Sequence, residues 1–282
     1  MPEEPERTRA ARRAAETALV RIVHHYGERP GFVLLGGLVP EILCSGSEYR
    51  HAGTTDVDVQ VDLEIASGAV NMSRLERALL NAEFEPSAER VWRWTTQEGR
   101  TQSIIKFELL ADVGSAAAQA IVAFDGCQNL GAVNLRGTGF AARDTLVHPL
   151  SARVNGDLRH IEINVTGIAG FLLAKASAAH SRRKAKDWYD IAFVLLHNND
   201  GGVTAAAKAV LSKFSGELVG SMKTALDDLA ANFSAVGDQG PSAYATQVLL
   251  DHPEQDAATL RADAVTAVSE FHRALFPSGG TR

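Results

Sequence analysis

The sequence predicts a fold of the mixed α/β class (α+β), with a mixed sheet in the first half and helices in the second half. Up to about residue 160, short apolar runs typical of strands alternate with amphipathic stretches typical of helices. From about residue 166 onward, only helical spacing of apolar residues is found. We therefore predict an α/β domain at residues 1–160 and a helical domain at residues 161–282.

The first half alternates between the two kinds of element. Helices are expected over about residues 5–26, in LVPEILC, where proline is tolerated in the first turn, and in MSRLERALLNAEF. Strands are expected in GFVLLGG, TTDVDVQVDLEI, RVWRWTT and SIIKFELLA, and extended chain in GAVNLRG and TLVHPLSARV. The second half predicts helices in GIAGFLLAKASAAHSR, KDWYDIAFVLLHN, TAAAKAVLSKF, LVGSMKTALDDLAANF and ATLRADAVTAVSEFHRALF.

Composition narrows the class of protein. Hydrophobic residues make up 45% and charged residues 22%, as in an ordinary globular protein, and no apolar run approaches the roughly 20 residues of a membrane helix. The charged start lacks the apolar core of a secretory signal, and the two cysteines lack metal-type spacing, so a cytoplasmic protein is expected. The net charge of −6 argues against bulk binding to nucleic acid, although RTRAARR and HSRRKAK leave room for local contact.

The strand TTDVDVQVDLEI carries acids on one face and apolar residues on the other. Side chains alternate along a strand, so Asp56 and Asp58 project from the same face, with Cα atoms roughly 6.6–6.8 Å apart. Two carboxylates at that spacing suit a hard divalent cation. A solvated face is the alternative, and it is the interpretation we prefer for Asp62 and Glu64.

Two further features extend this candidate site. Gly36 and Gly37 end a strand and precede a helix, where glycine lets a phosphate approach backbone N–H groups, although such a turn is often only a tight connection. Glu108 becomes a third metal ligand if its strand pairs beside that of Asp56; an ion pair with a neighbour is the alternative. The order glycine turn, helix, acidic strand suits a magnesium-bound nucleoside triphosphate.

The helical half contains charges where apolar residues are expected. Lys175 interrupts an apolar stripe, and after a break near residues 182–184, Asp187 and Asp190 lie one turn apart beside another stripe. We expect these three charges at half-buried positions, where they are costly unless they pair with each other or with a ligand. They predict either a structural bridge between two helices or a lysine that binds triphosphate.

Together these motifs resemble the AbiEii/AbiGii-type nucleotidyltransferases of the DNA-polymerase-beta-like superfamily, which include toxins of type IV toxin–antitoxin systems and the MenT toxins of mycobacteria. The resemblance lies in VLLGGLVPEIL…RHAGTTDVDVQVDL and AKASAAHSRRKAKDWYDI, roughly residues 30–66 and 160–196. The stretch between the glycine pair and the acidic strand is longer than usual in the superfamily, and the family does not fix the third acid at the position of Glu108.

The resemblance implies a nucleotidyltransferase fold in the first half and a role for each matched residue. Asp56 and Asp58 would bind Mg²⁺ or Mn²⁺, and Lys175 would hold the β- and γ-phosphates of a nucleoside triphosphate. Asp187 would activate the acceptor hydroxyl or orient Lys175. The residues implied in nucleotide binding are Gly36, Gly37, Thr54, Thr55, Lys175 and Asp190.

The resemblance also implies a toxin that transfers a nucleotide to RNA, with the 3′ end of tRNA as the expected acceptor, a cognate antitoxin as the expected partner and no association with a membrane. Two other functions stay open at this point. One is a nucleotidyltransferase that modifies a small molecule such as an antibiotic. The other is a nucleotide-binding module without catalysis.

Overall fold

The computed structural model describes residues 8–61, 71–88, 90–98 and 103–277. The chain divides into two compact units, which we name the sheet unit (Met1–Val39 and Ala52–Thr166) and the helical unit (Pro40–His51 and Gly167–Arg282). A mixed sheet in the first half and helices in the second confirm the predicted fold class. The domain limits 1–160 and 161–282 stay a prediction; the grouping of residues 40–51 with the helical unit has no signature in the sequence.

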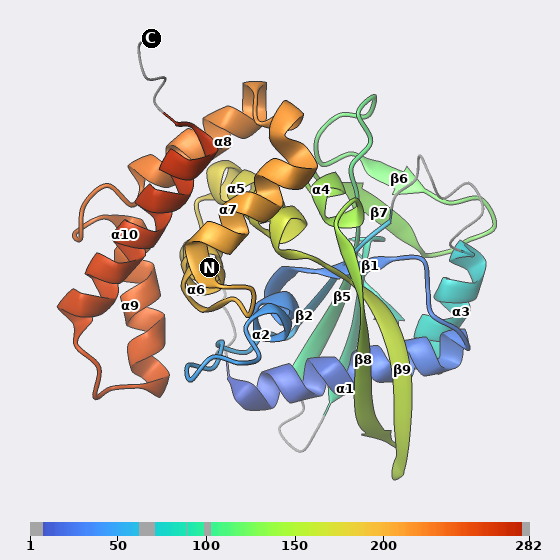
Figure 1. Cartoon of the computed structure of the whole chain (residues 1–282). Helices are drawn as coiled ribbons and strands as arrows, with labels where there is room; N and C mark the ends of the chain where they lie inside the picture. Colours follow the sequence, from blue (N-terminus) through green and yellow to red (C-terminus); the bar gives the residue numbers. More distant parts are fainter. Residues whose placement is uncertain (1–7, 62–70, 89, 99–102, 278–282) are drawn as a thin grey trace. The chain divides into compact units, whose positions relative to one another are not determined.

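Within the described residues, the sheet unit holds one nine-stranded mixed sheet (Figure 1). Its main path has the order β3-β4-β5-β2-β1-β9-β8, and β7 pairs with both β5 and β6. The bounds are β1 (Val33–Leu35), β2 (Asp56–Gln60), β3 (Glu85–Pro86), β4 (Arg93–Glu98), β5 (Ser103–Ala111), β6 (Ile121–Ala123), β7 (Gly131–Asn134), β8 (Thr145–Val154) and β9 (Asp157–Thr166).

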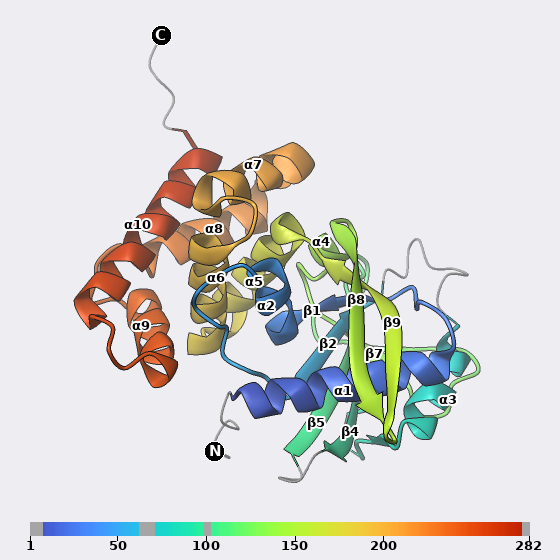
Figure 2. The same ribbon diagram turned by 60° about the horizontal axis from the view of Figure 1, so that its bottom comes forward.

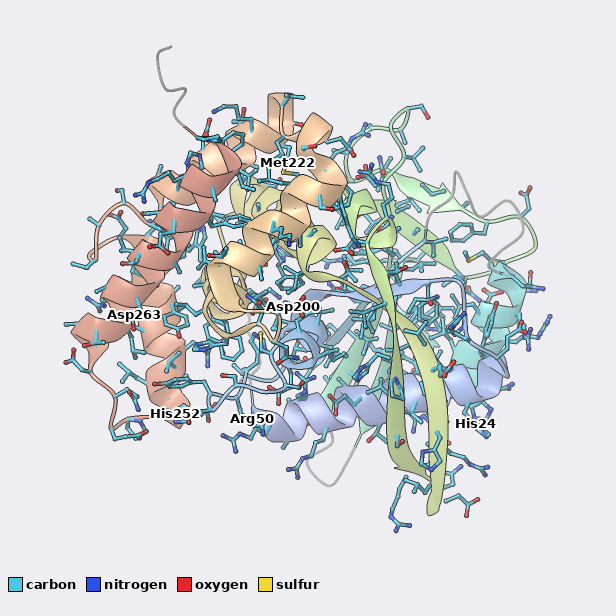
Figure 3. All side chains as sticks on the ribbon, viewed as in Figure 1. His24, Arg50, Asp200, Met222, His252 and Asp263 are labelled. Carbon is cyan, nitrogen blue, oxygen red and sulfur yellow. The ribbon has the colours of Figure 1, made fainter. Side chains whose placement is uncertain are left out.

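Helix α1 (Arg9–Tyr26) lies along the sheet, against the β8–β9 hairpin, with α3 (Met72–Asn81) at its side (Figures 1 and 2). It begins at Thr8, whose Oγ1 accepts a hydrogen bond from the amide of Ala11, and it ends at Gly27 with φ of +87°. The exposed His24, labelled in Figure 3, stands in its last turn. The sheet unit also contains the short helix α4 (Gly139–Ala142).

The apolar face of the acidic strand is buried, as predicted. Val57 and Val59 of β2 are 0% exposed, and Val57 is paired in register with Phe107 of β5. Phe107 is paired in turn with the buried Trp94 of β4, and its ring meets that of Phe32 edge-on at 6.1 Å. This core leaves the carboxylates of β2 on the opposite face of the sheet. Asp62 and Glu64 lie outside the described residues.

The helical unit consists of antiparallel and crossing helices with apolar faces turned inward. Their bounds are α5 (Ile168–Arg182), α6 (Ala185–His197), α7 (Gly202–Phe214), α8 (Gly220–Ala231), α9 (Gln239–Asp251) and α10 (Ala257–Leu275). The unit also contains most of α2 (Val39–Leu43) and a short 3₁₀ turn at Ser215–Glu217, whereas the 3₁₀ turn at Gly36–Leu38 belongs to the sheet unit. The predicted break between α5 and α6 is confirmed: Arg183 adopts the left-handed conformation, with φ of +48°. No helix among the described residues has the length and apolar character required to cross a membrane.

Aromatic rings form a continuous row inside the helical unit. His197 at the end of α6 contacts the rings of Phe193, Tyr49 and Tyr244, at centroid distances of 4.7, 5.1 and 6.3 Å. Its Nε2 lies 2.8 Å from the Tyr244 hydroxyl. Burial in this row lowers the pKa of His197 to about 4, so the ring is neutral at physiological pH.

His197 therefore makes the stability of the fold dependent on pH. Between its ordinary pKa near 6.5 and its folded pKa of about 4, the unfolded chain binds a proton at His197 that the folded chain does not, so stability falls as the pH falls through this window. We expect wild type to lose more unfolding free energy than His197→Gln between pH 7 and pH 5. Urea unfolding of both proteins at the two pH values measures this difference. An equal loss in both proteins would contradict the assignment.

Candidate active site

The glycine pair and the acidic strand meet in the sheet unit. β1 and β2 are antiparallel, and Leu35, which precedes the glycines, is paired in register with Asp58. Gly36 has φ of +78°, and a Cβ atom at this position would lie 2.0 Å from Oδ2 of Asp58. Only glycine permits both this backbone conformation and this approach. The sequence order of the two motifs is thus matched by direct contact between them.

The second glycine contacts the threonines that lead into the strand. A Cβ at Gly37 would lie 3.0 Å from Cβ and 3.1 Å from Oγ1 of Thr54. Oγ1 of Thr54 accepts a hydrogen bond of 3.1 Å from the amide of Asp56, which holds the start of β2. The Oγ1 atom of Thr55 is buried, with no hydrogen-bond partner among the described residues. Thr54 therefore has a structural role, while the hydroxyl of Thr55, the residue before Asp56, is buried.

Two basic residues accompany the carboxylates. β5 lies parallel to β2, which pairs Asp56 with Lys106 and Asp58 with Glu108. The Lys106 ammonium lies 3.4 Å from Oδ1 of Asp56. The strand neighbour required for Glu108 as a third ligand is present, but Glu108 also accepts a hydrogen bond of 2.5 Å from Nε of Arg93 on β4. Glu108 thus has both features considered for it: it lies on the strand next to Asp56 and Asp58, and it forms an ion pair with Arg93.

The donors on this face suit a magnesium ion shared with a substrate. Mg²⁺ is commonly held by one or two carboxylates together with substrate phosphates, rather than by an all-protein cage. Asp56 and Asp58 supply two such carboxylates beside Gly36, where any side chain would collide with Asp58. Across the ranges described, no group of three or more His, Cys, Asp or Glu is arranged to hold a metal. Asp56 and Asp58 therefore provide two of the oxygen ligands that a magnesium ion shared with a phosphate-bearing substrate would need.

The charges predicted in the helical half form one buried cluster. The ammonium of Lys175 on α5 donates to Oδ1 of Asp187 at 3.1 Å and to Oδ2 of Asp190 at 2.7 Å, both on α6. Both aspartates are 0% exposed and Lys175 is 6% exposed, so the three are more deeply buried than the sequence indicated. The cluster bridges two helices, as in the structural interpretation, and it also holds a cation in a fixed place.

Neighbouring charges keep this cluster ionised. Burial alone lowers the pKa of Lys175, but Asp190 and Asp187 outweigh burial, so the pKa lies above its ordinary value. Burial alone raises the pKa of Asp187, but the charges and hydrogen bonds of Lys175 and Arg182 bring it below its ordinary value. At neutral pH the cluster therefore contains an ammonium and an aspartate carboxylate, both charged.

Two members of the cluster were not predicted. Arg182, in the last turn of α5, forms a two-pronged pair with Asp187, from Nε to Oδ2 at 2.6 Å and from Nη2 to Oδ1 at 2.7 Å. Nε2 of His51 lies 2.9 Å from Oδ1 of Asp190, although 139 positions separate the two residues. The sequence predicts local contact with nucleic acid for the run HSRRKAK, which contains Arg182, and gives no sign of its pair with Asp187. No local pattern points to His51, which stands between YR and AGT.

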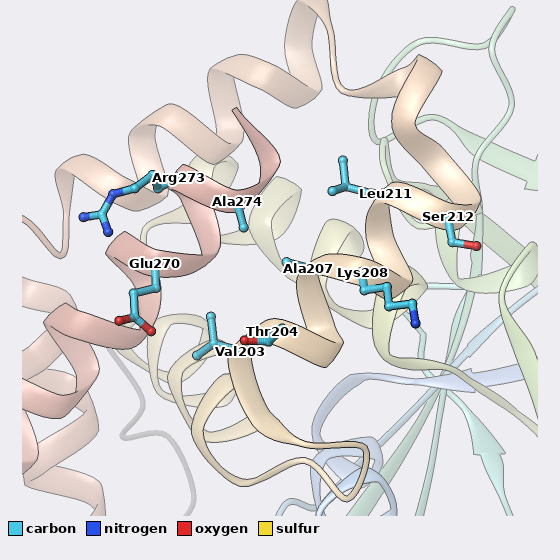
Figure 4. Close-up of a pocket in the computed structure, with 9 residues that line it drawn as sticks. All are labelled: Val203, Thr204, Ala207, Lys208, Leu211, Ser212, Glu270, Arg273 and Ala274. Atoms are coloured by element: carbon cyan, nitrogen blue, oxygen red, sulfur yellow. The ribbon is translucent and has the colours of Figure 1, made fainter. Parts of the chain in front are cut away.

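A separate groove of about 900 Å³ lies between α7 and α10 (Figure 4). Lys208, Glu270 and Arg273 line it, together with apolar residues such as Leu211 and Ala274. None of the residues predicted for catalysis, metal binding or nucleotide binding contributes to it. The groove is therefore separate from the candidate active site.

A mixed sheet whose glycine turn contacts a D-x-D strand, followed in the chain by a helical Lys–Asp cluster, agrees with the class of nucleotidyltransferases that the sequence resembles. The family model described as "Nucleotidyl transferase AbiEii toxin, Type IV TA system" matches residues 17–271. The chain therefore belongs to the AbiEii family of nucleotidyltransferase toxins of type IV toxin–antitoxin systems, and it is an enzyme. Membership implies a nucleotide substrate and an antitoxin partner. Searches of curated proteins and of solved structures gave no match.

Gly36→Ala tests the contact between the glycine turn and the acidic strand. The added methyl group must displace Asp58 as well as adopt a positive φ, so we expect a loss of roughly 2–4 kcal/mol in unfolding free energy. Gly156→Ala is the matched control, since Gly156 has φ of +89° and a Cβ atom added there would meet nothing within 4 Å; a loss of about 1 kcal/mol is expected. Chemical denaturation compares the two variants. Equal losses would mean that the Asp58 contact is unimportant.

Lys175→Met tests the buried cluster. Removal of the ammonium leaves two buried carboxylates with less compensating charge, so we expect a loss of about 3–5 kcal/mol in unfolding free energy. Lys223→Met is the control, because Lys223 forms an exposed pair with Asp227 at 2.6 Å, and less than about 1 kcal/mol is expected. Thermal and urea unfolding measure both. A Lys175 variant as stable as the control would argue against a cluster of this kind.

Proposed function

We propose that this protein transfers a nucleoside monophosphate from a nucleoside triphosphate to an RNA acceptor, with the 3′ end of tRNA as the expected target, in a reaction that requires Mg²⁺ or Mn²⁺. The observation that carries the proposal is the approach of the Gly36 turn to Asp58. It brings backbone without a side chain, suited to phosphate, next to carboxylates suited to metal, and a metal–triphosphate complex needs both.

In this proposal the sheet unit binds the metal and part of the phosphate chain. Asp56 and Asp58 are the metal ligands, and a bound divalent cation would neutralise charge on the phosphates during transfer. Gly36 and Gly37 approach the phosphates through their backbone. Thr55 donates a hydrogen bond from its hydroxyl to a phosphate oxygen, while Thr54 supports the start of the strand. The Arg93 pair favours Glu108 as the anchor of Arg93 over Glu108 as a third ligand.

The helical unit supplies the fixed positive charge. Lys175 binds the β- and γ-phosphates, while Asp187 and Asp190 hold its ammonium in place. The low pKa of Asp187 and its two-pronged pair with Arg182 favour orientation of Lys175 over proton abstraction from the acceptor. The acceptor hydroxyl releases its proton to solvent and its oxygen attacks the α-phosphorus; a new P–O bond forms, the bond from the α-phosphorus to the bridging oxygen of the β-phosphate breaks, and pyrophosphate leaves. Positioning and charge neutralisation account for most of the acceleration.

An RNA acceptor is supported by charges beside the Lys175 cluster. Arg183 and Lys184 are exposed at the turn between α5 and α6, and Lys186 lies in the first turn of α6. These side chains are suited to local contact with a phosphodiester backbone, in a protein whose net charge of −6 does not favour broad coverage of RNA. We further propose that the protein acts on RNA as a toxin in the cytoplasm, held in check by an antitoxin, as its family suggests.

The test is transfer of label to RNA. Total tRNA, Mg²⁺ and each labelled nucleoside triphosphate are incubated with wild type, with Asp56→Asn/Asp58→Asn, and with Asp157→Asn, which removes an exposed carboxylate of β9. We expect labelled RNA from wild type and from the Asp157 control, and a loss of roughly 10²-fold or more in the double variant. A chelator should abolish the reaction and added Mg²⁺ should restore it.

Other outcomes would revise specific parts of the proposal. Label on a small hydroxyl-bearing antibiotic but on no RNA would replace the acceptor and keep the chemistry. Unchanged transfer by the double variant would overturn the metal site. Glu108→Gln should leave the Mg²⁺ concentration for half-maximal activity unchanged, whereas a several-fold increase would identify Glu108 as a ligand.

A further inference from the structure

Residues 40–51, which we name the strap, are held in the helical unit by polar contacts at several points. Asn199, just after α6, accepts from the amide of Gly46 at 2.9 Å and donates to Oγ of Ser45 at 3.0 Å. Its own amide donates to the carbonyl of Leu43 at 2.9 Å. A ring contact adds to these bonds, since the rings of Tyr49 and His252 have centroids 5.0 Å apart. Figure 3 labels His252 and Arg50, the residue after Tyr49. The strap is thus a fixed part of this unit.

The strap ends at His51, whose ring is inserted into the charged cluster. His51 is 1% exposed and stacks on Tyr189 at 4.9 Å, with the ring of Phe193 edge-on at 5.1 Å. Because carboxylate oxygens accept, Nε2 of His51 donates to Oδ1 of Asp190 at 2.9 Å. The backbone amide of His51 donates to the carboxylate of Glu41, also in the strap, at 2.9 Å. The ring is therefore fixed both by its stacking partners and by the main chain.

Asp190 connects His51 to Lys175. A carboxylate group is planar and rigid, so a hydrogen bond that fixes Oδ1 also fixes Oδ2. Oδ2 is the atom that accepts from the Lys175 ammonium, at 2.7 Å. Asp187, the other partner of Lys175, is fixed independently by Arg182. An ammonium has three N–H donors, and with two directed at the carboxylates the direction of the third is determined.

We propose that His51 is a positioning residue: it fixes Asp190, and through Asp190 it aims the Lys175 ammonium at the β- and γ-phosphates. This inference rests on the proposed function of Lys175. The chain runs directly from His51 into Gly53–Thr55 and the carboxylates of β2, so a single stretch of sequence supplies both the support for the lysine and the metal ligands. His51 does not touch substrate in this role.

Two amide substitutions separate positioning from packing. His51→Gln places a side-chain N–H₂ near the position of Nε2 and keeps a donor for Asp190, whereas His51→Asn is one methylene shorter and does not reach it. Both lose the stacked ring. Their affinities are measured with Mg²⁺ for a fluorescent nucleoside triphosphate and for the corresponding monophosphate, which lacks the β- and γ-phosphates.

We expect His51→Asn to weaken triphosphate binding about tenfold without changing monophosphate binding, and His51→Gln to remain within about threefold of wild type. In a Lys175→Gln background the two substitutions should have no further effect, because the group they act through is absent. Tyr189→Leu, which removes the stacking partner and keeps the donor, should change the two affinities by the same factor. Thermal unfolding identifies any variant that does not fold.

Four results would overturn the inference. In the first, His51→Asn and His51→Gln bind triphosphate equally well; in the second, both weaken monophosphate binding as much as triphosphate binding; either result means packing alone. In the third, the effect of His51→Asn persists at full size in the Lys175→Gln background, which excludes action through Lys175. In the fourth, Lys175→Gln itself leaves triphosphate affinity unchanged, so the proposed role of Lys175 fails and the inference fails with it; the first three results leave that role intact.

Discussion

The helical unit depends on one interaction, the buried ammonium of Lys175 between the carboxylates of Asp187 and Asp190. Ions of this size are expensive to remove from water, and their mutual attraction offsets that expense only if the remaining hydrogen-bonding groups are also satisfied. Arg182 and His51 provide that satisfaction, one for each aspartate. A well-packed apolar cluster would stabilise the two helices as well or better. Burial of His51, Lys175, Asp187 and Asp190 in one cluster is consistent with a need for the positive charge itself.

The sheet unit solves a different problem, that of bringing backbone close to carboxylates. Its solution is register: antiparallel pairing of β1 with β2 sets Leu35 opposite Asp58, and the next residue turns the chain with a positive φ that only glycine adopts easily. Parallel pairing with β5 then places Lys106 and Glu108 beside the two acids. The electrostatics of this face are thus consequences of strand order, and a slip of one residue would move every one of these groups to the opposite face.

The sequence predicts those parts of the fold and site that have a local signature. The alternation of apolar and acidic residues predicts that Val57 and Val59 are buried and that Asp56 and Asp58 lie on the other face, as found. The interrupted apolar stripe likewise predicts an unusual role for Lys175. Contacts between distant segments have no such signature. His51 reaches Asp190 across 139 positions, and Arg93 reaches Glu108 because β4 and β5 pair, so neither partner is visible in its own neighbourhood. The depth of burial was underestimated for the same reason: α6 looks amphipathic alone, yet Asp187 and Asp190 are covered by other segments.

The two sets of charges differ in how they are balanced, and the difference has a chemical meaning. In the helical unit the cluster is internally compensated and almost fully buried, so the aspartates hold the lysine in place and are poorly accessible as bases. In the sheet unit the carboxylates are half-buried, and the ion pair of Asp56 with the Lys106 ammonium is long, at 3.4 Å. A divalent cation would therefore be stabilised more strongly beside Asp56 than beside Asp187, whose charge is already compensated. This asymmetry is the physical reason why we propose metal binding for the strand carboxylates and phosphate binding for the helical lysine.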